Sequence, residues 1–121
     1  MNIEEYAKVA PQYYTDEVPP ILSFLLKNND FHKILDCGCG DGSLLYALKK
    51  RKLLRDAKVG GIDLSSNRIS LVKKIDPKFI AKVDSAETLK TINANSIDFL
   101  ITTQVIEHVN DKKMTSTIQR V

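Results

Sequence analysis

A glycine-rich turn around residue 40 constrains the fold of this chain more than any other feature of its sequence. The segment from Ile34 to Leu45 reads ILDCGCGDGSLL, an apolar run that passes through alternate glycines into a helix-like pattern. Glycine permits positive φ and close approach of a ligand to the backbone, and the first turn of a helix offers unpaired amide groups. The segment therefore predicts a strand, a ligand-binding turn and a helix, in that order.

Short apolar runs alternate with helix-like stretches from Lys33 onward. The predicted strands, too continuously apolar to be half-exposed, are Lys33–Cys37, Lys58–Ile62, Phe79–Val83 and Ile97–Thr103. The predicted helices are Ser43–Lys52, Ser65–Ile75, a short one near Ser85–Lys90, and a last one after Asn110 or Asp111 with Met114, Ile118 and Val121 on one face. Such alternation predicts parallel strands with right-handed crossovers, and hence an α/β, doubly wound parallel sheet.

The opening segment, residues 1–30, has a helical pattern. One helical face carries Val18, Ile21, Leu22, Leu25 and Leu26, behind a predicted cap at Thr15 or Asp16. We expect this segment to cover the sheet as a helix. Because 121 residues are close to the common size of one domain, residues 1–121 are predicted to form a single domain, with the cover at 1–30 and the α/β core at 33–121.

The predicted sheet has an open edge. Phe99 to Ile101 would form an edge strand that invites pairing, and neither a glycine cap nor another stop signal follows the last predicted helix. We therefore expect either a fragment of a longer protein, truncated at its C-terminus, or a chain that completes its sheet by association, such as a homodimer through this edge.

Composition gives weaker constraints. The formal charge of +3 and the pI near 8.8 are mildly basic, and the basic groups at 49–52 and 73–74 end predicted helices, so nucleic acid is not indicated as a partner. The first residues lack signal-peptide features and no apolar run approaches the roughly 20 residues of a membrane span, which predicts a cytoplasmic protein without a membrane partner. Cys37 and Cys39 match neither a redox nor a zinc spacing, and we expect reduced packing residues.

Acidic residues stand at the ends of the first three predicted strands. Asp36 precedes the glycine turn, and Asp63 and Asp84 follow the next two strands. A dinucleotide-binding turn requires G-x-G-x-x-G, but here Gly42 comes one residue early, and Asp36 would repel a pyrophosphate. Three converging carboxylates instead suit a ligand with several donors. S-adenosylmethionine presents an α-ammonium group, two ribose hydroxyls and an adenine amine.

The stretch from Ile34 to Val109 resembles the class I S-adenosylmethionine-dependent methyltransferase family. It matches the family's D-x-G-x-G-x-G loop, its acidic second strand, a V-D-S-A-E-x-L segment and an I-D-x-x-x-x-x-x-V-I-E-H-V segment. The resemblance implies a Rossmann-like sheet, of which about four of the family's seven strands are present. It also implies S-adenosylmethionine as cofactor and S-adenosylhomocysteine as product.

The resemblance further assigns site residues. The methionine end would be held by Asp36, Gly38, Gly40 and Gly42, lined by Gln104 and covered by Tyr14. The ribose hydroxyls would bind to Asp63, and one face of adenine would contact Leu64. The edge of adenine would contact Asp84, Ser85 and Ala86. Asp63 and Asp84, taken singly, would also serve as helix caps, and Tyr14 would also pack with its hydroxyl in water.

The segment Gln104 to His108 bears on the acceptor. Some terminal-ribose RNA methyltransferases hold a metal with E-x-x-E-H and a later histidine. Here Gln104 takes the first position and no histidine follows His108, so no metal is expected. The segment V-I-E-H-V is also typical of methyltransferases that act on quinones and other small molecules. This resemblance favours a small-molecule acceptor over RNA or protein. The sequence identifies no catalytic base, and two alternatives stay open: a non-catalytic cofactor-binding fragment, or a nucleotide- or NAD-binding Rossmann domain.

Overall fold

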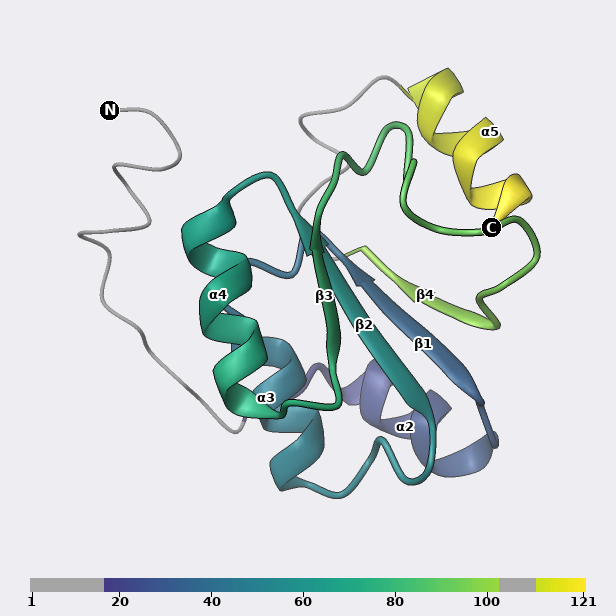
Figure 1. Cartoon of the computed structure of the whole chain (residues 1–121). Coiled ribbons are helices and arrows are strands. Elements are labelled where there is room, and N and C mark those ends of the chain that lie inside the picture. Colours follow the sequence, from purple (N-terminus) through teal and green to yellow (C-terminus); the bar gives the residue numbers. More distant parts are fainter. Residues whose placement is uncertain (1–16, 103–110) are drawn as a thin grey trace.

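A four-stranded parallel sheet forms the centre of the computed structural model, which describes residues 17–102 and 111–121 (Figure 1). The elements are α2 (Pro20–Asn28), β1 (Lys33–Cys37), α3 (Ser43–Lys50), β2 (Lys58–Asp63), α4 (Ser66–Ile75), β3 (Ile80–Val83), β4 (Phe99–Ile101) and α5 (Asp111–Arg120). The strand order is β3-β2-β1-β4, and every neighbouring pair is parallel. The predicted α/β class with a parallel sheet is confirmed.

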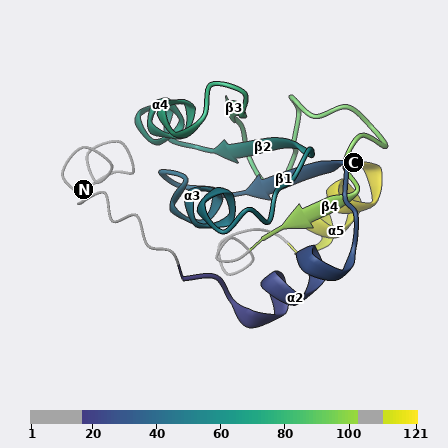
Figure 2. The same ribbon diagram turned by 90° about the horizontal axis from the view of Figure 1, so that it is seen from below.

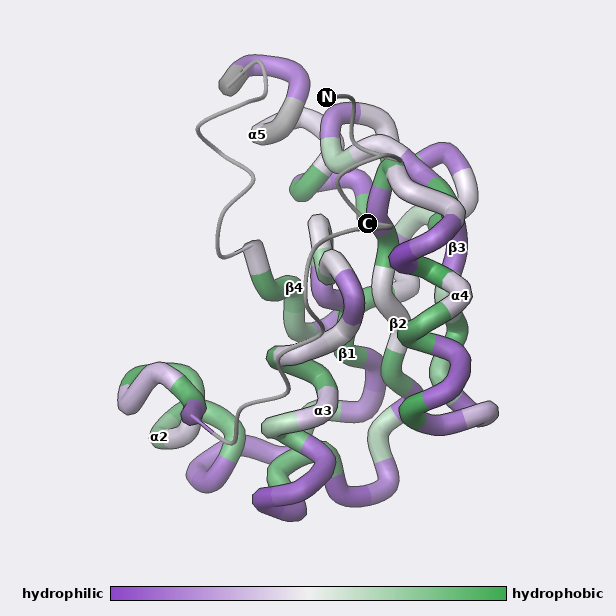
Figure 3. Tube along the Cα trace, turned by 90° about the vertical axis from the view of Figure 1, so that its left-hand side faces the viewer, coloured by the Kyte–Doolittle hydropathy of each residue, from purple (hydrophilic) through white to green (hydrophobic). Residues whose placement is uncertain are grey.

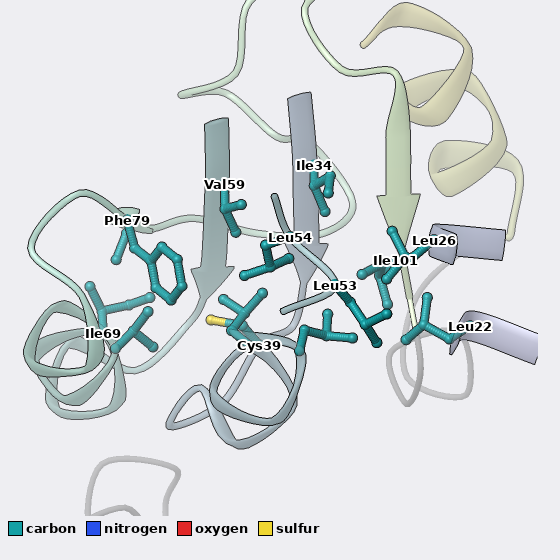
Figure 4. Packing of buried hydrophobic residues seen from close by; sticks show 14 residues of the cluster. Leu22, Leu26, Ile34, Cys39, Leu53, Leu54, Val59, Ile69, Phe79 and Ile101 are labelled. Carbon is teal, nitrogen blue, oxygen red and sulfur yellow. The ribbon is translucent and has the colours of Figure 1, made fainter. Parts of the chain in front are cut away.

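Helices and turns cover the two faces of the sheet unequally. α2, α3 and α4 lie on one face, whereas the chain between β3 and β4 and the end of α5 lie on the other (Figure 2). The larger core fills the first face, where Leu22 and Leu26 of α2 lie near Ile101 of β4 (Figure 4). Hydrophobic and hydrophilic residues alternate along α3 and α4 (Figure 3), so each helix contributes one side to this core.

The N-terminal cover is confirmed in part. α2 buries Leu22 and Leu26, but Ile21 is 66% exposed although its spacing predicts the same face. The helix begins at Pro20 with Pro19 as its N-cap, so the predicted cap at residue 15 or 16 does not start it. Proline fits a first helical turn because that turn leaves its amide positions unpaired. Residues 1–16 lie outside the described part of the chain.

Two helix predictions were wrong in detail. Residues 85–90 form turns instead of a short regular helix, and Leu89 within them has φ +44° while being fully buried. α5 begins at Asp111, within the predicted start, but Ile118 is 39% exposed, whereas Thr117 and the predicted Val121 are buried; the side chain of Met114 lies outside the described part of the chain. The reason is the same in both cases: hydrogen bonds between the turns and α5 outweigh the local apolar pattern.

Gly61 of β2 lets the glycine turn and α3 approach the sheet. Gly61 pairs in register with Asp36, and a Cβ at Gly61 would lie 2.8 Å from the Cys39 sulfur and 3.3 Å from a Leu45 methyl carbon. Cys39 and Leu45 are buried at this contact. The absence of a side chain at Gly61 is therefore what allows the turn to lie directly on β2.

Gly61→Ala is expected to lower the free energy of unfolding by about 1–3 kcal/mol, because the new methyl group overpacks the contact with Cys39. The same change made in a Cys39→Ala background should cost less, since the sulfur is gone. Urea unfolding of the four chains of this double-mutant cycle measures the difference. An equal loss in both backgrounds would contradict the contact.

Candidate functional site

The predicted glycine turn leaves the end of β1 and lies against the end of β2. Gly38, Gly40 and Gly42 have φ values of +77°, +59° and +89°. The amides of Gly38 and Cys39 both donate to the carbonyl oxygen of Ile62, at 2.8 and 2.9 Å. Residues other than glycine rarely adopt these backbone angles. The turn therefore requires glycine at these alternate positions.

Gly42 joins this turn to the start of α3. It is the N-cap of the helix in a left-handed conformation, without a side-chain cap. A Cβ at this position would lie 2.6 Å from the Ile75 side chain of α4, so the two helices are close here. Asp41 compensates for the missing side-chain cap, because its carboxylate accepts hydrogen bonds from the amide and the hydroxyl of Ser43, the first residue of α3.

Asp63, the last residue of β2, ties the turn to α4. Its Oδ2 accepts a hydrogen bond from the Gly40 amide at 3.0 Å, and its Oδ1 accepts one from the Ser65 amide at 3.0 Å. Arg68 of α4 places a guanidinium nitrogen 3.9 Å from the same Oδ2. The carboxylate is buried, yet each oxygen retains capacity for a further donor.

Asp36 lies beside this arrangement, and one of its two carboxylate oxygens has no hydrogen-bond partner among the described residues. The side chain is 2% exposed, and its Oδ1 is a buried oxygen that no hydrogen bond satisfies among the described residues. Burial, followed by the negative charge of Asp63, raises the pKa of Asp36 to about 7. A buried carboxylate with an unused acceptor atom is suited to a cation or a strong donor.

Asp84 follows β3 and is engaged by its own loop. Its two oxygens accept from the amides of Ser85, Lys90 and Thr91 and from the Thr91 hydroxyl, at 2.7 to 3.2 Å. Burial alone would raise the pKa of Asp84, but these hydrogen bonds together lower it. Thr91, Ser65 and Arg68 were not predicted as site residues, and the spacing of the motifs gave no signal for Thr91.

Of the remaining predicted residues, some are described by the structure and others lie outside the described residues. Leu64 is 61% exposed beside Asp63, whereas Ala86 is buried just after Asp84. Gln104 and Tyr14 lie outside the described residues, as do Glu107 and His108.

Neither cysteine is suited to nucleophilic chemistry. Cys37 and Cys39 are both free thiols and both buried. Burial, and then the charge of Asp36, raises the pKa of the Cys37 thiol to about 12, and the pKa of Cys39 is raised for the same two reasons. Because the thiolate is the reactive form, both residues act here as small packing side chains.

Within residues 17–102 and 111–121, no group of three or more histidine, cysteine, aspartate or glutamate residues is placed to hold a metal ion. In the same part of the chain, no helix has the length and apolarity needed to cross a membrane.

The fold and the arrangement at the strand ends define an α/β protein with a glycine turn after its first strand, and comparison with known proteins gives its family. A family model described as a methyltransferase domain matches residues 34–121. The chain therefore belongs to the methyltransferase domain family, as its motifs predict.

Individual relatives agree with this family. The chain is 33% identical to the mitochondrial ubiquinone biosynthesis O-methyltransferase of Rattus norvegicus over 92% of its own length, but spans only 36% of that protein. A crystal structure of an S-adenosylmethionine-dependent methyltransferase of Methanococcus maripaludis is similar over 98% of this chain and 55% of its own, with a TM-score of 0.66 and 19% identity. A phosphoethanolamine N-methyltransferase of Haemonchus contortus, in complex with S-adenosylhomocysteine, is 26% identical, with a TM-score of 0.60, over 74% of this chain and 21% of its own.

The raised pKa of Asp36 predicts how stability depends on pH. The unfolded carboxyl ionises near 3.8 and the folded one near 7, so Asp36 makes the fold less stable as pH rises through this interval. Asp36→Asn removes the effect and should be the more stable chain at pH 8, by up to roughly 4 kcal/mol. Urea unfolding of both chains at pH 5 and pH 8 measures the difference, which should widen at the higher pH. A constant difference would show that Asp36 titrates normally.

Proposed function

We propose that this chain binds S-adenosylmethionine at the carboxyl ends of β1, β2 and β3 and serves as the cofactor-binding part of a methyltransferase. The observation that carries the proposal is the buried Asp36 carboxylate with an unsatisfied oxygen next to the glycine turn. An α-ammonium group would supply both the charge and the donors that Asp36 lacks. The positive φ values of Gly38, Gly40 and Gly42 give the turn the shape that would hold the methionine part.

The other two parts of the cofactor fit the neighbouring strand ends. Asp63 has free acceptor capacity on both oxygens for the two ribose hydroxyls. The exposed Leu64 offers an apolar surface for one face of adenine, and Ser85 and Ala86 would present main-chain groups to its edge. Gln104 and Tyr14 stay predicted contacts of the methionine side.

The contribution of these residues to methyl transfer is orientation. The bound cofactor supplies an activated methyl group on a sulfonium centre, which reacts by in-line displacement. Asp36 and Asp63 would fix the two ends of the cofactor and so direct the methyl group toward one approach path. Fixing the geometry of reacting groups is among the larger contributions to catalysis, and it needs no metal ion. We identify no catalytic base.

The acceptor is proposed to be a small molecule such as a quinone precursor. The support is the resemblance of the Val105 to Val109 segment to small-molecule methyltransferases and the 33% identity to a ubiquinone biosynthesis O-methyltransferase. Transfer of a labelled methyl group to a polyhydroxylated aromatic compound, compared with transfer to total tRNA or to protein, tests it. Labelling of RNA or protein alone would reject this acceptor class.

The organisation of the protein also stays a proposal. We infer a single methyltransferase domain over residues 1–121, a cytoplasmic location, and association through the open edge of β4 if the sheet is not completed otherwise. Size measurement in solution tests the last point, and a monomer would reject the homodimer.

Calorimetric titration tests cofactor binding. S-adenosylhomocysteine should bind the wild-type chain more tightly than NAD does. Its affinity should rise between pH 6 and pH 8, because the ligand's ammonium group requires an ionised Asp36, whose pKa is about 7. Asp36→Asn should bind at least tenfold more weakly at pH 8, in line with the loss of a charged hydrogen bond of about 1.5–3 kcal/mol.

A matched control is Asp56→Asn, which removes an exposed carboxylate from the loop before β2, away from the glycine turn. Its affinity and pH dependence should equal those of the wild-type chain. Tighter binding of NAD, or equal binding by the Asp36 and Asp56 variants, would reject the proposed site.

A further inference from the structure

The chain between β3 and β4 has no regular secondary structure, yet it is held firmly at its base. Asp84 accepts four hydrogen bonds from residues 85, 90 and 91, and a carboxylate has about four acceptor positions. All of them are therefore used within the segment that Asp84 begins. In this arrangement Asp84 acts on the site by shaping the turns, and an adenine amine would have to displace one of these donors.

The same turns are held from the opposite side by α5. The Arg120 guanidinium donates to three carbonyl oxygens, those of Thr88 at 3.1 Å, Leu89 at 2.7 Å and Ile92 at 2.8 Å. The Thr117 hydroxyl donates to the carbonyl of Glu87. The end of α5 is fixed in return, because its carbonyl groups at 120 and 121 accept from the amides of residues 95 and 97.

These contacts add to the few hydrogen bonds within the turns, in which the Leu89 amide donates to the Ser85 carbonyl and the Ile92 amide donates to the Leu89 carbonyl. Arginine has five donors in a planar fork, so a single side chain can bond to three carbonyls at once, of which that of Leu89 also accepts from the Ile92 amide. Lysine has three donors on one nitrogen and cannot span the same three oxygens. Leu89, fully buried with φ +44°, shows that the segment adopts a conformation that its own sequence does not favour.

We propose that Arg120 is a positioning residue for the adenine side of the site: by holding the turns after Asp84, it fixes where the main chain of Ser85 and Ala86 meets the adenine edge. The inference rests on the proposed function. The Ser85 amide is already bonded to Asp84, whereas no hydrogen bond of the Ala86 amide occurs among the described residues. The Ala86 amide is thus available to donate to a ring nitrogen of adenine. Arg120 touches neither group and acts through the turns.

The test compares two ligands that differ only at this edge. S-adenosylhomocysteine has a ring nitrogen, N1, that accepts a hydrogen bond, whereas in S-inosylhomocysteine the same nitrogen carries a proton and repels an amide donor. The wild-type chain should therefore bind the adenosyl ligand at least tenfold more tightly. Arg120→Ala should lose most of this preference, through weaker binding of the adenosyl ligand alone. Arg120→Lys should be intermediate.

Lys112→Ala is the matched control, because it removes a positive charge from an exposed position on the same helix. It should keep the wild-type preference. Thr117→Val, which removes only the contact to Glu87, serves as a milder variant if Arg120→Ala does not fold, and it should reduce the preference in part.

Each outcome has a distinct meaning. If the wild-type chain binds neither ligand, the proposed function fails. If it binds and prefers the adenosyl ligand but the folded Arg120 and Thr117 variants keep the full preference, the positioning role is overturned. Equal weakening of both ligands would also overturn it, since that result indicates general destabilisation.

Discussion

The site depends on the hydrogen bonds between the glycine turn after β1 and the end of β2. The Gly38 and Cys39 amides donate to the Ile62 carbonyl, and the Gly40 amide donates to the Asp63 carboxylate, which also accepts from the Ser65 amide before α4. These hydrogen bonds require the glycine turn to lie flat on β2. That packing is possible because Gly61 has no side chain. A packing constraint inside the sheet thus determines the position of the main chain at its rim.

The three carboxylates at this rim differ in how they are satisfied. Asp63 and Asp84 are held by main-chain amides, which compensate for their burial, whereas one oxygen of Asp36 has no partner among the described residues. An uncompensated buried charge lowers stability and is retained only where another interaction makes use of it. The cost falls on the folded protein alone, and the proposed cationic ligand would remove it. Under the proposed function, Asp36 would therefore lower the stability of the fold and strengthen ligand binding.

Much of this arrangement could be predicted from the sequence. The strands, the glycine turn and the acidic residues at the strand ends follow from apolar runs and from residues a few positions apart, such as Asp36 and Gly38. The turns at 85–90 could not be predicted in this way. Their shape depends on Arg120, 28 to 32 residues later, and a local pattern contains no information about such a contact. For the same reason the inner side of α5 shows Thr117, where apolar spacing predicts Ile118.

The two halves of the proposed site are therefore stabilised by contacts from different elements. The proposed methionine side consists of Asp36, the glycine turn and Asp63, which the parallel pairing of the central strands brings together although Asp63 lies 23 residues beyond Gly40. The proposed adenine side is a set of turns that Asp84 holds at the base and α5 holds from the opposite side. Under the proposed function, a disturbance of α5 would consequently affect recognition of the base before it affects binding of the amino acid part, because the hydrogen bonds of Thr117 and Arg120 go to these turns.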